Sequence, residues 1–437
     1  MTFFMQAVDD LLDEMRTQRR DLHHFAETGW VEFRTASHVA QQLHQLGYHL
    51  AVGKAVIDAE SRMGLPSAEF LAEHEARARA QGAVEPWISS FSGGFCGVVA
   101  TLDTGRPGPV MAFRVDMDAL DQTEANDGEH FPQQQGFASV NPGMMHACAH
   151  DGHTTIGLAL AKILMRNKER LSGKIKLIFQ PAEEGVRGAK AMVAAGVVDD
   201  VDLFTAIHLG TGVPEGEIVC GNDSFLSTTK FDLRFTGVSA HAGGNPEQGN
   251  NALLAAAHAT LGLHSLTQHS GGVGRVNVGV LQAGSGRNVV PDIALMKVET
   301  RGENNRINDD IYQRCQQIIA GAAAMFQVDY HVTLVGGARS CSPSPQWVAF
   351  IHQQAKKLGI FTSVIDQQAH AAGSEDATYM MERVKERGGQ ASYVIFGCQL
   401  AAGHHNARFD FDEAVMSQAV KTLAALAFNQ AEFQHPR

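Results

Sequence analysis

Residues 145–153 (MHACAHDGH) concentrate side chains that bind metals or carry protons. The stretch holds three histidines, one cysteine and one aspartate, and an apolar helical run follows it. Cys148 and His150 are two residues apart, so a turning backbone can direct both side chains at one ion, while Asp151 could brace a ligand from behind. A lone buried cysteine is more often a packing residue. The metal interpretation therefore depends on what the rest of the chain brings to the same place.

Further candidate ligands stand where predicted strands end. A glutamate pair follows KIKLIF, one histidine follows the run at residues 203–207, and a histidine pair follows the run at residues 392–396. These residues are Glu183, Glu184, His208, His404 and His405. Each has an ordinary alternative: a solvated glutamate pair, a satisfied core histidine, or a turn in which only one histidine of the pair needs to point inward.

Strands and helices alternate along most of the chain, which predicts an α/β fold with a doubly wound, mostly parallel sheet. In such sheets ligands bind in the crevice outside the carboxyl ends of the strands. Asp116 and Asp118 follow the predicted strand at residues 110–115, and we interpret them as carboxylates that orient a metal ligand. The ligands that this edge would gather are Cys148, His150, Glu184, His208 and His405.

This set of side chains indicates a particular kind of metal site. A thiolate, imidazoles and a carboxylate together suit Zn²⁺, Mn²⁺ or Co²⁺ rather than Ca²⁺ or Mg²⁺. Five protein ligands are more than one open catalytic zinc site usually takes, so we expect two divalent ions that share a water. Glu183 then remains free of metal, and it could take a proton from that water and pass it to a leaving amine.

A second predicted unit interrupts the alternating pattern. From Thr229 the order becomes strand, helix, strand, strand, helix, strand, which is the ferredoxin-like βαββαβ unit. We therefore predict an inserted lid and dimerisation domain at residues 223–335. A discontinuous catalytic dimetal domain would comprise residues 1–222 and 336–437. Edge strands of such a unit can pair with another copy across a two-fold axis.

Three local predictions concern the catalytic body. Residues 5–24 have the periodicity of an amphipathic helix. Residues 97–102 and 110–115 flank the turn signal GRPGP and should form a hairpin or neighbouring strands. Residues 54–95 should form an insertion that carries a charged helix.

Composition limits the classes of partner. The net charge is -12 and no basic stripe stands out, which argues against nucleic acid. No apolar run approaches the roughly twenty residues that cross a bilayer, so we expect no membrane association. The N-terminal stretch lacks a small-residue cleavage site, and the six cysteines are scattered. We expect a cytoplasmic protein with reduced cysteines.

Several motifs in the same order carry a resemblance to a known family. They are FRVDMDAL, MHACAHDGHTT, FQPAEEG, AIHLG, SAHAG, GSGRNVVP, AGSED and GHHN. Together they look like the M20 family of dizinc or dimanganese aminoacylases and carboxypeptidases, in the branch with hippurate hydrolase and auxin-conjugate amidohydrolases. The resemblance covers nearly the whole chain, with residues 54–95 as the main excess. Ala149 departs from the pattern, because this branch more often has glycine there.

The resemblance implies roles for further residues. It assigns metal binding to the same five ligands and makes Glu183 the general base and then the acid. It implies that His241 in SAHAG and Asn288 in GSGRNVVP reach towards the substrate carbonyl, where both could hydrogen-bond a developing oxyanion. Arg301 could pair with a substrate carboxylate. The two ions would be Mn²⁺, which the resemblance favours, or Zn²⁺, which the thiolate favours.

The resulting expectation is hydrolysis of an N-acyl or N-aroyl amino acid, with p-aminobenzoyl-glutamate as the first candidate substrate. An amidohydrolase or carboxypeptidase of another specificity is the alternative. The assembly would be a homodimer through the lid domain or a heteromer with a paralogous B subunit. Two rivals stay open: a thiol hydrolase with Cys148 as nucleophile, and a catalytically weak metal-binding subunit.

Overall fold

The computed structural model describes residues 3–223, 225–369 and 373–433. The chain divides into two units. The first unit comprises residues 1–223, 341–370 and 376–437, and the second comprises residues 224–340 and 371–375. Each unit has its own sheet.

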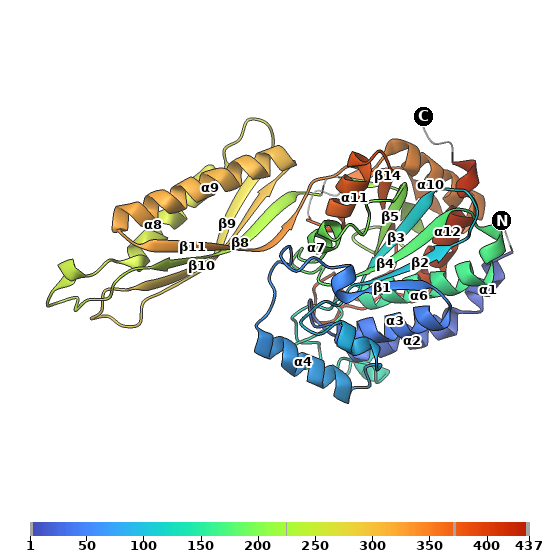
Figure 1. Ribbon diagram of the computed structural model, residues 1–437, viewed down its shortest axis with the longest axis horizontal. Helices are drawn as coiled ribbons and strands as arrows, with labels where there is room; N and C mark the ends of the chain where they lie inside the picture. The colour runs from blue at the N-terminus through green and yellow to red at the C-terminus, as the bar shows by residue number, and fades with distance from the viewer. Residues whose placement is uncertain (1–2, 224, 370–372, 434–437) are drawn as a thin grey trace. The chain divides into compact units, whose positions relative to one another are not determined.

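The first unit is built on an eight-stranded mixed sheet in the order β1-β2-β4-β3-β5-β14-β6-β12 (Figure 1). The strands are β1 (His49–Val52), β2 (Val98–Asp103), β3 (Val110–Asp116), β4 (Lys174–Gln180), β5 (Leu203–Leu209), β6 (Glu217–Val219), β12 (Ser363–Ile365) and β14 (Gln390–Phe396). A second, two-stranded sheet pairs β7 (Asn222–Asp223) with β13 (Gln368–Ala369). The central strands β4, β3, β5 and β14 are mutually parallel. They are almost wholly buried, as expected for parallel strands covered on both faces.

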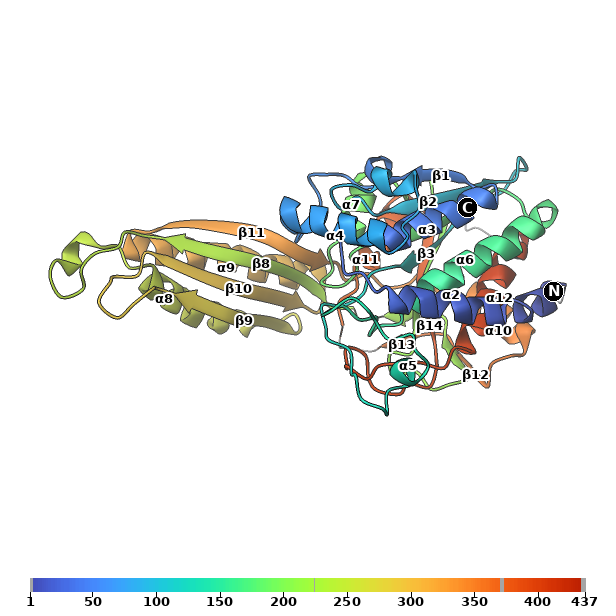
Figure 2. The ribbon, with the colours of Figure 1, turned by 90° about the horizontal axis from the view of Figure 1, so that it is seen from below.

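Helices cover both faces of this sheet, with α7 and α11 on one face and α6 and α12 on the other (Figures 1 and 2). The helices of this unit are α1 (Met5–Asp9), α2 (Leu12–His24), α3 (Phe33–Gln45), α4 (Ala68–Ala80), α5 (Phe131–Gln134), α6 (His150–Arg166), α7 (Ala189–Ala194), α10 (Pro345–Leu358), α11 (Ala377–Glu386) and α12 (Val415–Phe428). The predicted α/β fold is confirmed.

Two local predictions need correction. The stretch at residues 5–24 is not one helix, because it breaks between α1 and α2 at Asp10 and Leu11. The strands β2 and β3 do not form a hairpin, because β4 lies between them, antiparallel to β2 and parallel to β3. GRPGP is therefore a wider connection, and α6 provides the crossover that brings β4 beside β3.

The second unit is a four-stranded antiparallel sheet in the order β11-β8-β10-β9, with two helices on one face (Figure 2). Its elements follow the order βαββαβ along the chain: β8 (Ser227–Thr236), α8 (Ala252–His264), β9 (Gly274–Ala283), β10 (Ile293–Gly302), α9 (Asn305–Phe326) and β11 (Asp329–Ala338). Buried residues from both helices and all strands but β11 form its core, and Val332 of β11 packs against them. This is the strand order of a ferredoxin-like unit.

Among the residues that the structure describes, no helix is long and apolar enough to cross a membrane.

Candidate metal centre

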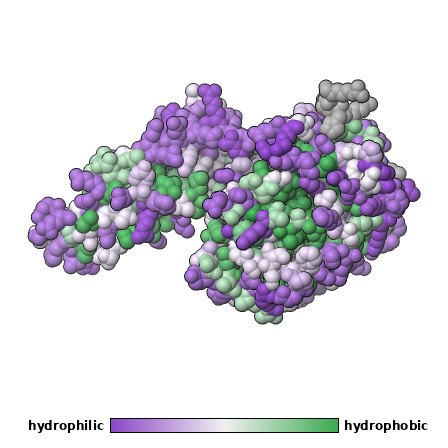
Figure 3. Space-filling model, in the orientation of Figure 1, coloured by the Kyte–Doolittle hydropathy of each residue, from purple (hydrophilic) through white to green (hydrophobic). Residues whose placement is uncertain are grey.

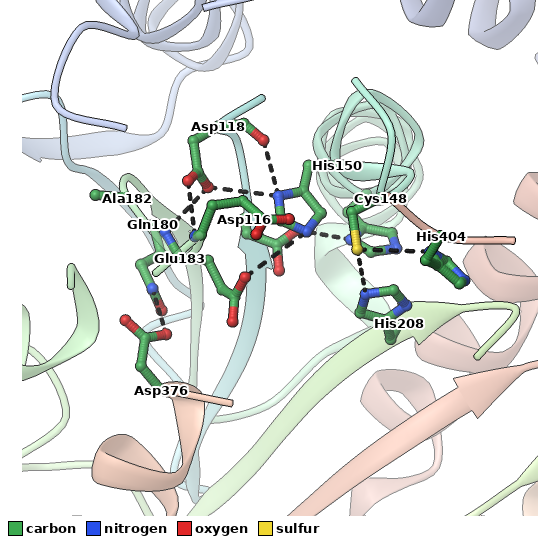
Figure 4. A network of polar contacts seen from close by, with 12 residues as sticks. Asp116, Asp118, Cys148, His150, Gln180, Ala182, Glu183, His208, Asp376 and His404 are labelled. Atoms are coloured by element: carbon green, nitrogen blue, oxygen red, sulfur yellow. Dashed lines mark hydrogen bonds and ion pairs between the residues drawn. The ribbon is translucent and has the colours of Figure 1, made fainter. Parts of the chain in front are cut away.

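Candidate ligands from five segments meet at the carboxyl edge of the central strands (Figure 4). Asp116 is the last residue of β3, the glutamate pair follows β4, and His208 is the second-last residue of β5. Cys148 and His150 lie at the start of α6. Ligand atoms lie within 4.8 Å of one another in three sets: Cys148, Glu184 and His405; Cys148, His208 and His404; and His150, Glu183 and Glu184.

The two buried histidines each keep one nitrogen for a ligand. His150 Nδ1 lies 2.8 Å from the carbonyl oxygen of Asp118, and His208 Nδ1 lies 2.8 Å from that of Leu209. A carbonyl oxygen only accepts, so Nδ1 carries the proton in both rings and Nε2 has a free lone pair. In the part of the chain that the structure covers, His150 Nε2 is buried without a hydrogen-bond partner. His208 Nε2 lies 3.5 Å from Cys148 Sγ.

The carboxylate of Asp118 holds the loop that carries the glutamate pair. It accepts the backbone N–H of Glu183 at 3.0 Å and that of Glu184 at 2.8 Å. Glu184 Oε1 is buried, makes no hydrogen bond among the described residues, and lies 3.4 Å from His405 Nε2. Asp118 therefore positions two segments, His150 through its carbonyl and the glutamates through its carboxylate.

Two further histidines are excluded as ligands by their own hydrogen bonds. His153 Nδ1 lies 2.6 Å from Asp116, and its Nε2 accepts the N–H of Leu209 at 3.0 Å. His404 Nε2 accepts the N–H of Thr211 at 3.0 Å. The remaining nitrogen of His404, Nδ1, therefore carries the proton and faces Cys148 Sγ at 3.5 Å.

His146 is buried, and neither of its nitrogens has a hydrogen-bond partner among the residues that the structure describes. Burial, with the nearby His23 and His150 charges, lowers its pKa to about 3, so it is a neutral packing residue. Of the histidine doublet, His405 lies with the ligands, and His404 lies behind the thiol.

The backbone around the site adopts an uncommon conformation. Five non-glycine residues in its loops have positive φ: Ala149, Ala182, Val186, Thr211 and His405. Only two other non-glycine residues with positive φ are found among the described residues, Trp30 and Gln327. Such residues gather at functional sites, where the surrounding structure fixes them. The φ of 66° at Ala149 is one that glycine adopts without strain, in line with the glycine that the resembled branch more often has there.

A buried charge network supports the edge from below, and no pattern in the sequence signals it. Arg114 donates to Asp116 at 2.7 Å and to Gln180 at 2.8 Å. Asp376 accepts from Gln180 at 2.7 Å and from the backbone of Ala189 at 2.8 Å. Burial opposes the charge of Asp116, but His150, His153 and Arg114 hold its pKa well below the usual range. Asp116 therefore stays ionised and orients the neighbouring imidazoles.

Without a metal the cluster holds protons. Burial and the Glu184 charge raise the pKa of Cys148, while hydrogen bonding to Cys148 and Glu184 raises the pKa of His405 to about 10. Metal binding would release these protons, because thiolate and neutral imidazole are the binding forms. The unpartnered lone pair of His150 and the mixed donor set fit a divalent transition ion.

Glu183 lies beside this centre. Its carboxylate is about nine-tenths buried, and Oε2 is 4.0 Å from His150 Nε2. A carboxylate in this position can exchange a proton with a group held by the ligands.

Three predicted substrate-binding residues lie in the second unit. The backbone N–H of Ala242 donates to the carbonyl of Asn288 at 3.0 Å, so the loops of His241 and Asn288 lie side by side. His241 Nδ1 accepts backbone N–H groups of Gly243 and Gly244, which leaves Nε2–H exposed as a donor. Arg301 instead binds Glu299 through two contacts of 2.8 and 3.2 Å.

Comparison with known proteins gives a consistent result. The family model for peptidase family M20/M25/M40 matches residues 112–429. The chain is 62% identical to indole-3-acetyl-aspartic acid hydrolase of Enterobacter agglomerans, covering 98% of each chain. It is 61% identical to the larger-named relative p-aminobenzoyl-glutamate hydrolase of Escherichia coli (strain K12), in its A component, covering 97% of each. The crystal structure of the aminobenzoyl-glutamate utilization protein from Klebsiella pneumoniae matches with a TM-score of 0.85, 55% identity and 97% of each chain covered.

Proposed function

Because the chain belongs to peptidase family M20/M25/M40, we propose that it is a two-metal amidohydrolase that releases an amino acid from an N-acyl or N-aroyl conjugate. The observation that carries this proposal is the meeting of Cys148, His150, Glu184, His208 and His405 beside Glu183. The two relatives at 61–62% identity are named for conjugates of an acidic amino acid, aspartate in one and glutamate in the other. We take p-aminobenzoyl-glutamate, cleaved to p-aminobenzoate and glutamate, as the first substrate to test.

The residues divide the chemistry among themselves. The five ligands would hold two divalent ions, which supply Lewis-acid polarisation of the amide carbonyl and a water of lowered pKa. Glu183 takes the proton from the attacking water and returns it to the leaving amine. Asp118 keeps Glu183 in place through the backbone N–H at 3.0 Å. The burial of Glu183 excludes bulk water from this proton transfer.

His241 and Asn288 are proposed to stabilise the oxyanion. The exposed Nε2–H of His241 and the side-chain amide of Asn288 are both donors, which is what a tetrahedral oxygen requires. Arg301 is a weaker candidate for the substrate carboxylate, because Glu299 already occupies its guanidinium.

The ion is proposed to be Mn²⁺ or Zn²⁺. The thiolate of Cys148 favours zinc, while the carboxylate of Glu184 suits manganese as well. Metal analysis of the purified protein, followed by chelation and reconstitution with each ion, decides between them.

Replacement of Glu183 tests the proposal directly. Glu183→Ala should reduce turnover of p-aminobenzoyl-glutamate by at least about 100-fold, because a positioned acid-base group contributes roughly 10²–10⁴. The metal content should remain two ions per chain, since Glu183 is not assigned as a ligand. Retained turnover would remove Glu183 from its role, and loss of metal would make it a ligand instead.

The same preparation separates the two rivals. A thiol hydrolase would form an acyl adduct on Cys148 and would not need metal, whereas reactivation by added metal after chelation supports the proposed function. A metal-loaded protein that hydrolyses no conjugate would favour the catalytically weak role.

A homodimer through the second unit is proposed, and the alternative is a heteromer with a paralogous B subunit. Apolar residues lie among polar ones on the surface of this unit (Figure 3), including Leu261 at 76% exposure, Leu295 at 41% and Leu334 at 40%. Such exposure is typical of surfaces that another chain covers. We also propose a cytoplasmic location, to which the six free, buried cysteines are suited.

A further inference from the structure

A cavity in the first unit lies outside the set of metal ligands. It has a volume of about 270 Å³. Its lining residues come from four segments: Thr28, Gly29, Pro66, Ser67, Phe70, Asp121 and Arg187. Three of these, Pro66, Ser67 and Phe70, belong to the excess segment at residues 54–95. This volume accommodates an amino-acid side chain.

The cavity adjoins the loops that form the candidate metal centre. Arg187 Nε donates at 2.8 Å to the carbonyl of Glu184, so the guanidinium is attached to the loop of a proposed ligand. On the opposite wall, Thr28 forms a β-bridge with Ala119, the residue after Asp118. A molecule in the cavity would therefore lie beside the segment that carries Glu183 and Glu184.

Arg187 is a half-buried cation that the described residues leave without a carboxylate partner. It donates to two backbone carbonyls, that of Glu184 and, at 3.4 Å, that of Gly64. In the described ranges 3–223, 225–369 and 373–433, it forms no ion pair within 4.0 Å. A guanidinium has five N–H donors, and these two contacts leave several of them available to a planar anion.

The neighbouring acids do not neutralise Arg187 at neutral pH. Glu32 is close enough to interact with Arg187, but burial and the Asp118 charge raise the pKa of Glu32 to about 8. Asp121 lines the cavity with an exposed side chain, where water screens its charge. The cavity therefore combines one available cation with the apolar surfaces of Pro66 and Phe70.

We propose that Arg187 binds the side-chain carboxylate of an acidic amino acid in the substrate, while Pro66 and Phe70 contact its methylene groups. This inference rests on the proposed function, and it makes Arg187 the residue that selects aspartate and glutamate conjugates. A glutamine conjugate has the same shape but no charge, so it should bind less well. The α-carboxylate is common to every such conjugate and gives no discrimination between the two.

The test compares p-aminobenzoyl-glutamate with p-aminobenzoyl-glutamine as substrates. The wild-type protein should have a kcat/KM about 10- to 100-fold higher for the glutamate conjugate, the range of one charge-assisted interaction. Arg187→Gln should bring this ratio close to one. Arg62→Gln is the matched control, because Arg62 lies in the excess segment, binds the Gly93 carbonyl and does not line the cavity. It should keep the wild-type ratio.

Three results would overturn the inference: a wild-type ratio near one, an unchanged ratio in Arg187→Gln, or an equal loss on both substrates. Arg187→Lys decides the case in which Arg187→Gln loses its metal ions. Lysine keeps the charge but not the planar fork, so the ratio should fall several-fold and stay above one.

A binding measurement separates this inference from the proposed function. Calorimetry with the metal-loaded Glu183→Gln protein should give tighter binding of the intact glutamate conjugate than of the glutamine conjugate. Adding Arg187→Gln should remove that preference. Absence of turnover by the wild-type protein on both conjugates would refute the proposed function, while the binding preference would still decide the role of Arg187.

Discussion

Replacing His404 tests how the Cys148 thiolate is held. The ring is fixed from two sides: Thr211 N–H donates to Nε2 at 3.0 Å, and Nδ1 lies 3.5 Å from Cys148 Sγ. The glycine before Thr211 is part of this arrangement, because a Cβ at Gly210 would come within 2.9 Å of His404 Nε2. The proton on Nδ1 thus points at the sulfur, and His404→Ala would remove that donor.

The expected effect is weaker metal binding without loss of a binding site. Groups that orient a ligand without touching the metal typically contribute 10- to 100-fold in affinity. This corresponds to about 1.4–2.7 kcal/mol. Because Cys148 is buried, little water competes for its thiolate, and we expect the upper half of this range.

The assay is a competition titration of the metal-free protein with a chromophoric chelator, for His404→Ala and wild type at one pH. His24→Ala serves as the control, because His24 binds a backbone carbonyl elsewhere. Cobalt-loaded protein gives a second readout, since loss of the hydrogen bond should shift the sulfur-to-metal charge-transfer band. Unchanged affinity and spectrum would refute the reasoning. Loss of one whole equivalent of metal would refute it differently, by making His404 a ligand.

Two further predictions concern buried charges away from the ligands. Arg19 is fully buried and binds Asp151 at 2.8 Å, Asp410 at 2.6 Å and Glu413 at 3.3 Å, so Arg19→Met should destabilise the protein by about 3–5 kcal/mol in urea unfolding. Arg16→Met, which removes an exposed pair, should cost less than about 1 kcal/mol, and equal losses would contradict the assignment. Glu32 has a folded-state pKa of about 8, above its ordinary value of 4.5, so the stability due to its neutral form is complete below pH 4.5 and is lost as the pH rises through 8. Glu32→Gln should therefore gain stability over wild type between pH 5 and pH 9, on the order of a few kcal/mol at pH 9; a difference independent of pH in thermal unfolding of the metal-free protein would contradict this.

The sequence was informative where chemistry and periodicity coincide. Polar residues at the ends of apolar runs predicted an edge that the structure contains, with Asp116 at the end of β3 and His208 near the end of β5. The βαββαβ order followed from local periodicity alone. The hairpin prediction failed because strand neighbours are chosen by burial over the whole sheet, and β4 pairs between β2 and β3 after a crossover of more than fifty residues.

Other features of the site could not be read from the sequence because their partners are distant in the chain. Arg114 and Asp376 are 262 residues apart, and Arg19 and Glu413 are 394 apart. Arg187 has no neighbour in sequence that marks it as part of a cavity. Nothing in a spacing pattern distinguishes such arginines from the solvated ones that most proteins carry.

The histidine doublet shows most clearly what the sequence lacks. His404 and His405 are chemically identical, and what distinguishes them is which of their atoms the surrounding backbone occupies. The N–H of Thr211, presented by a residue with φ of 48°, takes Nε2 of His404 and so converts this ring into a donor towards Cys148. The carbonyls of Asp118 and Leu209 do the reverse for His150 and His208, leaving a lone pair on each. Since a backbone group makes each of these choices, residue identity at the partner position carries little information, and only the fold assigns the roles.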